Sequence, residues 1–124
     1  MPDMMENQGV FLFEKLGVYQ RGIEFADKAF TLIDELPRGQ SAIADQLKRA
    51  VISIPLNIAE GNGRWHQKER RNFFFIARGS AFECVPLLEL CQRRKWIEKK
   101  DHDDLRKELV VLSKMLNGLI RSGE

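Results

Sequence analysis

The sequence predicts an all-α protein, a single domain over residues 1–124 folded as an antiparallel up-down-up-down four-helix bundle. Three observations support this prediction. Apolar residues recur in four long segments with the period of roughly 3.5 residues that marks a buried helix face. Short turns separate these segments, which favours antiparallel neighbours. No stretch of useful length shows the two-residue alternation of a β-strand.

The first helix is expected to run from Leu16 to Leu36, because a residue before a proline disfavours the α conformation. Its apolar seam consists of Leu16, Tyr19, Ile23, Ala26, Phe30 and Ile33. A second apolar strip, formed by Phe25, Ala29 and Leu32, predicts that this helix is covered on more than one side. Residues 1–9 lack periodicity and are expected to form a mobile tail.

The second helix is expected to run from Ser41, as its N-cap, to about Glu60. Gly61-Asn62-Gly63 is expected to supply left-handed residues that end it, an interpretation preferred to a phosphate-binding loop. Pro55 removes a backbone N–H in the middle of the helix. We expect a kink there, or alternatively a break near Ser53-Ile54.

The third helix is expected to run from about Gln67–Glu69 to about Lys95. Gly79 is expected to allow a neighbouring helix to approach, and Pro86 to disturb the helix as Pro55 does. The predicted inner face consists of Phe73, Ile76, Ala77, Ser80, Glu83, Cys84, Leu87 and Leu90. Phe75 and Phe82 lie among charges on the opposite face, which predicts contact with another subunit.

The fourth helix is expected to begin after an N-cap at Asp101 and to bury a seam of Leu105, Leu109, Leu112, Leu116 and Leu119. Cys84 and Cys91 are seven residues apart on one helix, about 10 Å along its axis. That separation exceeds disulfide reach, so both are interpreted as small core residues.

A polar stripe runs along the second helix and consists of Gln46, Arg49, Ser53, Asn57, Glu60 and Arg64. Antiparallel pairing with the third helix predicts an Arg49–Glu83 ion pair, contact between Ser53 and Ser80, and Glu60 within reach of Arg70 and Arg71. The predicted structural polar seam is therefore Arg49, Ser53, Asn57, Glu60, Ser80 and Glu83, and Glu83→Leu is expected to destabilise the fold. The alternative, Glu60 or Glu83 as a general base, lacks a nucleophile–base pair, a metal set or a phosphate loop, so no catalytic residue is predicted.

Positive charge is concentrated in two segments, each with one tryptophan. Residues 64–71 carry a net charge of +3 and residues 93–100 a net charge of +4, in a chain whose total is +2. This asymmetry predicts an anionic partner. The candidate nucleic-acid-binding residues are Arg64, Trp65, Lys68, Arg70, Arg71, Arg93, Arg94, Lys95, Trp96, Lys99 and Lys100. The competing interpretation is that both segments are solvated turns whose tryptophans cap the core.

One family resemblance extends over about residues 19–119. The stretches Ser53-Ile54-Pro55-Leu56-Asn57-Ile58-Ala59-Glu60-Gly61, Gly63-Arg64 and Ile76-Ala77-Arg78-Gly79-Ser80 resemble the bacterial 23S rRNA intervening-sequence proteins. The resemblance implies a four-helix bundle that forms a homopentameric ring, and kinship with accessory proteins of diversity-generating retroelements. It implies no established activity and no catalytic residues. The chain departs from the family pattern at Trp65-His66 and at Cys84-Val85-Pro86.

These observations favour a non-enzymatic, homo-oligomeric protein that binds nucleic acid, RNA before DNA. The alternative is a scaffold that docks a polymerase or another protein, and an enzyme is the least favoured class. No cofactor and no metal are expected. The apolar runs are too short to span a bilayer, and the acidic N-terminus lacks the basic region of a secretory signal, so a cytoplasmic location without membrane contact is expected.

Overall fold

The computed structural model describes residues 9–122 and confirms the all-α class. Its helices are α1 (Gly17–Asp34), α2 (Ser41–Asn62), α3 (Gln67–Arg93) and α4 (Lys99–Ser122), preceded by a short 3₁₀ helix, η1 (Leu12–Lys15). The predicted mobile tail, apart from Gly9, lies outside the described residues. The sequence analysis did not predict η1, because a single 3₁₀ turn is too short to show apolar periodicity.

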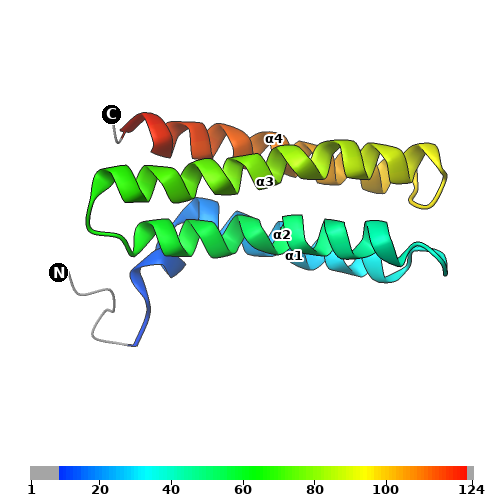
Figure 1. Ribbon diagram of the computed structural model, residues 1–124, viewed down its shortest axis with the longest axis horizontal. Coiled ribbons are helices and arrows are strands. Elements are labelled where there is room, and N and C mark those ends of the chain that lie inside the picture. The colour runs from blue at the N-terminus through cyan, green and yellow to red at the C-terminus, as the bar shows by residue number, and fades with distance from the viewer. Residues whose placement is uncertain (1–8, 123–124) are drawn as a thin grey trace.

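Consecutive helices run in opposite directions, as predicted (Figure 1). Each helix contacts two others, in the cyclic order α1–α2–α3–α4, and α2 and α3 share the most extensive contact. The α2–α3 turn lies at one end of the bundle, beside the last turn of α4. The α1–α2 and α3–α4 turns lie at the other end. The two basic segments are therefore separated by the length of α3, about 40 Å.

Three predicted helix ends were wrong in their details. Ser41 is the first helical residue rather than an N-cap, and no side chain caps this end. The end of α2 needs no left-handed residue, because the backbone at Gly63 has a φ of −81°. Lys99, two residues before Asp101, is the first residue of α4. Positive φ values occur instead at Lys95, with a φ of 63° just after α3, and at Gly39, with a φ of 90° in the turn before α2.

Both internal prolines lie inside continuous helices, so the alternative of a break near Ser53-Ile54 was wrong. Pro55 is buried and faces α1 at Gly22. A Cβ placed on Gly22 would lie 3.5 Å from the Cβ of Pro55, an ordinary van der Waals distance. A methyl group at Gly22 would therefore fit without displacing Pro55, and α1 packs beside the proline ring here without requiring a glycine.

The buried faces of α1 and α3 differ from those predicted. On α1 the buried face combines Phe25 and Ala29 of the second apolar strip with only one member of the predicted seam, Ile33, whereas Ile23 of that seam is 44% exposed. On α3 Ile76, Glu83 and Leu90 are exposed, contrary to prediction. The buried residues are Val18, Gly22, Phe25, Ala29 and Ile33 on α1, and Phe74, Ala77, Ala81, Cys84, Leu88 and Cys91 on α3. The predicted leucine seam of α4 is buried except for Leu119, which is half-buried beside the buried Ile120.

The helices α2 and α3 approach each other closely at Gly61. A Cβ on this residue would lie 2.8 Å from Cε1 of Phe74 and 3.1 Å from the carbonyl oxygen of Arg70. Gly61 is therefore required for packing, not for ending the helix. Gly79, which was expected to permit such an approach, has nothing within 4 Å of an added Cβ, so that prediction was wrong.

The polar stripe of α2 is only partly an internal seam. Ser80 donates a hydrogen bond to Ser53 between the two hydroxyl oxygens (2.7 Å), as the pairing predicted, and Asn57 donates to the same hydroxyl (2.9 Å). Arg49 and Glu83 are both exposed and form no ion pair with each other or with any other described residue. The predicted Arg49–Glu83 pair was therefore wrong.

The seam prediction failed because it assumed burial. No polar or charged residue among residues 9–122 is fully buried. The charged groups of long side chains at the helix edge therefore reach the solvent and are hydrated by water. Glu60 likewise pairs with Arg64 on its own helix face (3.0 Å) instead of the predicted Arg70 or Arg71.

We expect Gly61→Ala to lower the free energy of unfolding in urea by about 1–3 kcal/mol, because the new methyl group must displace Phe74 or the α3 backbone. Gly79→Ala is the matched control on an open helix surface, and it should raise the same quantity by up to about 1 kcal/mol. Equal stability of Gly61→Ala and the wild type, at one protein concentration, would contradict the close α2–α3 contact.

We expect Ser80→Ala to lower the free energy of unfolding by about 1 kcal/mol, because it removes the inter-helix bond to Ser53. Glu83→Leu, in contrast, should change it by no more than about 0.5 kcal/mol, since an exposed and unpaired carboxylate is lost. A loss above about 2 kcal/mol for Glu83→Leu would restore the ion pair that the sequence suggested.

Candidate nucleic-acid interface

The α2–α3 end of the bundle presents the more accessible of the two tryptophans. Trp65 lies in the turn between the helices and is 58% exposed. One turn further on, Lys68 is exposed, and its ammonium group has no hydrogen-bond or ion-pair partner among residues 9–122. An exposed indole and an unpaired cation at one end of a protein are the groups with which proteins stack on the bases and contact the phosphates of single-stranded nucleic acids.

Two other cations of this segment are engaged in holding the turn together. The guanidinium of Arg70 donates to the backbone carbonyls of Asn62 (3.0 Å) and Arg64 (3.4 Å), so it caps the last turn of α2. Arg64 pairs with Glu60, and its Cζ lies 4.8 Å from the ring centroid of Phe73. Arg71 is half-buried. Among the predicted binding residues of this end, Arg64 and Arg70 therefore hold the turn, whereas Trp65 and Lys68 are accessible.

The α3–α4 end has a different character. Trp96 is half-buried and packs against the core, with Arg94 Cζ 5.8 Å from its ring centroid. This matches the competing interpretation of a tryptophan that caps the core. Lys99 is bonded to Asp103 (2.8 Å), which lowers the pKa of that carboxyl, and Arg93 lies 4.0 Å from Glu89. Lys95 and Lys100 are exposed and have no partner among the described residues.

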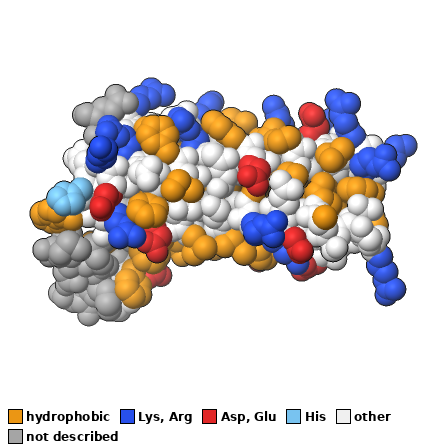
Figure 2. All heavy atoms as spheres, in the orientation of Figure 1, with side chains coloured by type: hydrophobic (Ala, Val, Ile, Leu, Met, Phe, Trp, Pro, Cys, Tyr) orange, Lys and Arg blue, Asp and Glu red, His pale blue; other side chains and the backbone are white. Residues whose placement is uncertain are grey.

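Figure 2 shows that Lys and Arg side chains stand out at both ends of the bundle, and that hydrophobic side chains are exposed between them. Phe75 and Phe82 are exposed, as predicted (44% and 53%). Arg78 covers both, with Cζ 5.0 Å and 5.6 Å from the two ring centroids, and donates to Asn117 of α4 (2.8 Å). Their role as subunit contacts stays a prediction.

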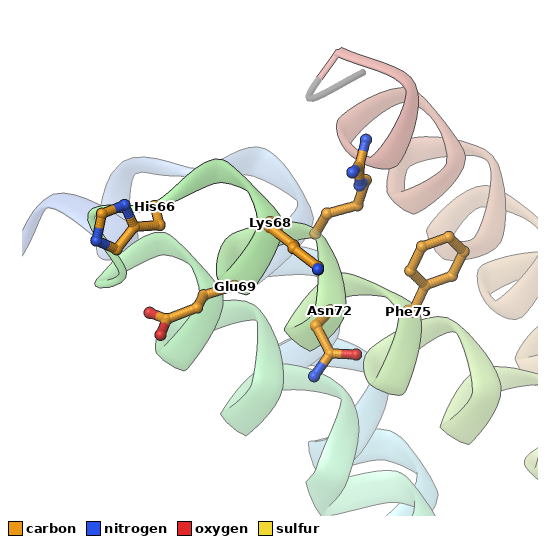
Figure 3. A pocket seen from close by; sticks show the side chains of 6 residues that line it. His66, Lys68, Glu69, Asn72 and Phe75 are labelled. Carbon is orange, nitrogen blue, oxygen red and sulfur yellow. The ribbon is translucent and has the colours of Figure 1, made fainter.

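An open depression of about 670 Å³ lies along the first turns of α3. Its lining consists of His66, Lys68, Glu69, Arg71, Asn72 and Phe75 (Figure 3). The sequence interpretation missed Asn72 as a candidate residue. The signal was present, because Lys68, Asn72 and Phe75 follow each other at helical spacings of four and three residues.

Three further features of the described residues concern metal ligands, the cysteine thiols and membrane-spanning helices. Within residues 9–122, no three His, Cys, Asp or Glu side chains are grouped so as to hold a metal ion. Cys84 and Cys91 are buried free thiols, as predicted, and burial with the nearby Glu83 raises the pKa of Cys84 to about 12. Along this part of the chain, no helix combines the length and the apolarity that a bilayer crossing requires.

The N-terminal segment also contributes to the α2–α3 end. The ring of Phe13 in η1 packs edge-on against Tyr19, with centroids 4.9 Å apart, and lines a shallow cavity with Leu56, Ala59 and Arg64. The segment is fixed by Gln20, whose side-chain amide donates to the carbonyl of Glu14 (2.9 Å). This arrangement extends the apolar surface beside the basic turn.

The four helices and the basic segments at their turns define a class of small helical-bundle proteins. The chain belongs to the 23S rRNA-intervening sequence protein family, whose sequence model matches residues 14–118. A crystal structure of a protein of unknown function from the S23 ribosomal protein family of Bacteroides thetaiotaomicron is similar, with a TM-score of 0.78 and 26% identity. The similarity covers 83% of this chain and 97% of that one. No curated protein matches the sequence.

We expect Arg70→Ala to lower the free energy of unfolding by about 1.5–3 kcal/mol, because the carbonyls of Asn62, at the end of α2, and of Arg64, in the turn, lose a charged donor. Lys68→Ala, on the same helix and without a partner, should change it by less than about 0.5 kcal/mol. Urea unfolding followed by circular dichroism measures both. Equal effects of the two substitutions would show that Arg70 does not cap α2.

Proposed function

We propose that the protein is a non-enzymatic, homo-oligomeric nucleic-acid-binding protein that contacts single-stranded RNA through the α2–α3 end of its bundle. The observation that carries this proposal is that the same end of the bundle presents the exposed indole of Trp65 and, three residues later in the sequence, the unpaired ammonium of Lys68. The name of the family, which refers to intervening sequences of 23S rRNA, favours RNA over DNA. The α3–α4 end contributes Lys95 and Lys100 as additional phosphate contacts.

Assembly would multiply these weak contacts. Each chain offers few accessible cations at the α2–α3 end, and several copies brought together raise the effective concentration of binding sites. Exposed apolar side chains on α2 and α3, among them Ile52, Leu56 and Leu90, support burial against further copies of the chain. Five subunits, the number implied by the family resemblance, is the favoured assembly.

The second candidate function is a protein-interaction scaffold, and a specific observation favours it. Phe75, Phe82 and Val110 are exposed on α3 and α4, and the guanidinium of Arg78 holds the two phenylalanine rings. A fixed aromatic surface of this kind suits a protein partner, because little side-chain freedom is lost on binding.

We expect the purified protein to sediment faster than a 14.4 kDa monomer and to carry a labelled single-stranded RNA at low salt. Trp65→Ala should weaken RNA binding by about fivefold or more, through lost stacking. Lys68→Ala should weaken it and reduce the slope of log K against log salt by about one. Analytical ultracentrifugation and fluorescence anisotropy measure these quantities together.

The control for charge is Lys107→Ala, which removes an exposed cation of α4 away from both turns and should leave RNA binding within about twofold. Assembly without any RNA binding at low salt would exclude the nucleic-acid function and leave the scaffold. Lys68→Ala, unlike Arg70→Ala, separates binding from folding, because Lys68 has no structural partner.

A further inference from the structure

The depression on α3 holds three different chemical groups on one side. Lys68, Asn72 and Phe75 gather along the helix, whereas the carboxylate of Glu69 points to the other side, beneath His66 (Figure 3). The distance along the axis from Lys68 to Phe75 is about 10 Å, at 1.5 Å per residue. A cation, an amide and an aromatic ring are thus presented in that order over two turns.

The ring of Phe75 is held by a neighbouring side chain and is still partly exposed. Arg78 lies over it, with Cζ 5.0 Å from the ring centroid, and Arg78 is itself fixed by the bond to Asn117. The residue nevertheless remains 44% exposed. An aromatic ring that is held in place and still exposed loses little freedom when a nucleobase stacks on it.

The side chain of Asn72 is exposed, and its amide has no partner among residues 9–122. A primary amide offers a donor and an acceptor side by side. This pair matches the amino group and ring nitrogen of adenine, which is the base that asparagine recognises in bidentate fashion. Lys68, on the other side of Asn72 from Phe75, supplies the cation for a phosphate.

We infer that the depression binds one unpaired adenine nucleotide of a single-stranded RNA, an inference that rests on the proposed function. The base stacks on Phe75, its amino edge bonds to Asn72, and a backbone phosphate contacts Lys68. Trp65 stacks on a neighbouring base without selecting it. The α2–α3 end therefore has a general contact at Trp65 and a base-selective contact at Asn72.

The test uses fluorescence anisotropy of the full-length protein at low salt with labelled oligo(rA) and oligo(rU) of equal length. The wild type is expected to bind oligo(rA) about fivefold or more tightly than oligo(rU). Asn72→Ala should reduce this ratio to within about twofold and leave oligo(rU) affinity unchanged. Phe75→Leu should weaken binding of oligo(rA) by about fivefold or more, because it keeps apolar bulk and removes the ring.

Phe82→Leu is the matched control, because Phe82 is also an exposed phenylalanine (53%, against 44% for Phe75) under the same arginine but outside the depression. It should bind oligo(rA) as the wild type does. Equal wild-type affinity for both oligonucleotides, an unchanged ratio in Asn72→Ala, or equal losses in Phe82→Leu and Phe75→Leu would overturn the inference. If Trp65→Ala still weakens binding in those cases, the proposed function survives. If the wild type binds neither oligonucleotide, both fail.

Discussion

The contact between Gly61 and the ring of Phe74 fixes the α2–α3 pair at its closed end. Only a residue without a side chain lets the two backbones approach this closely, and the guanidinium of Arg70 then reaches the last carbonyls of α2. The turn that carries Trp65 is held from both sides by these two interactions. The remaining helices pack against this pair, α1 at Pro55 and α4 through Arg78 and Asn117.

The interactions that hold this end together bear on the proposed function. Arg70 and Arg64 form their hydrogen bond and ion pair within the turn, so Trp65 and Lys68 are the groups left accessible at its surface. A binding surface on a fixed scaffold loses less conformational entropy than one on a mobile loop. At the α3–α4 end the tryptophan packs against the core and Lys99 is paired, so Lys95 and Lys100 remain as accessible cations without an exposed indole. Similar net charges in the sequence, +3 and +4, therefore correspond to two ends with different accessible groups.

The number, order and approximate ends of the helices were predictable, because apolar periodicity over twenty residues is a strong signal. The rotation of α1 and α3 was not, because each carries two apolar strips and one of them remains exposed, as at Ile23 and Ile76. The Ser53–Ser80 bond followed from helix pairing, whereas Arg49–Glu83 did not form, since water satisfies long charged side chains at a helix edge. Asn72 was missed because an exposed amide adds neither charge nor apolar periodicity, although its spacing from Lys68 and Phe75 places the three residues along one side of a helix.

The two buried cysteines provide a way to measure local opening of the bundle. Cys84 and Cys91 face the core from the middle and the end of α3, and both thiols have raised pKa values through burial. A thiol that is protonated and enclosed is inert toward alkylating reagents. Modification therefore requires the bundle to open, and a native chain samples such openings in proportion to its local stability. The rate at which each sulfur is alkylated consequently reports how often its part of the helix separates from its neighbours.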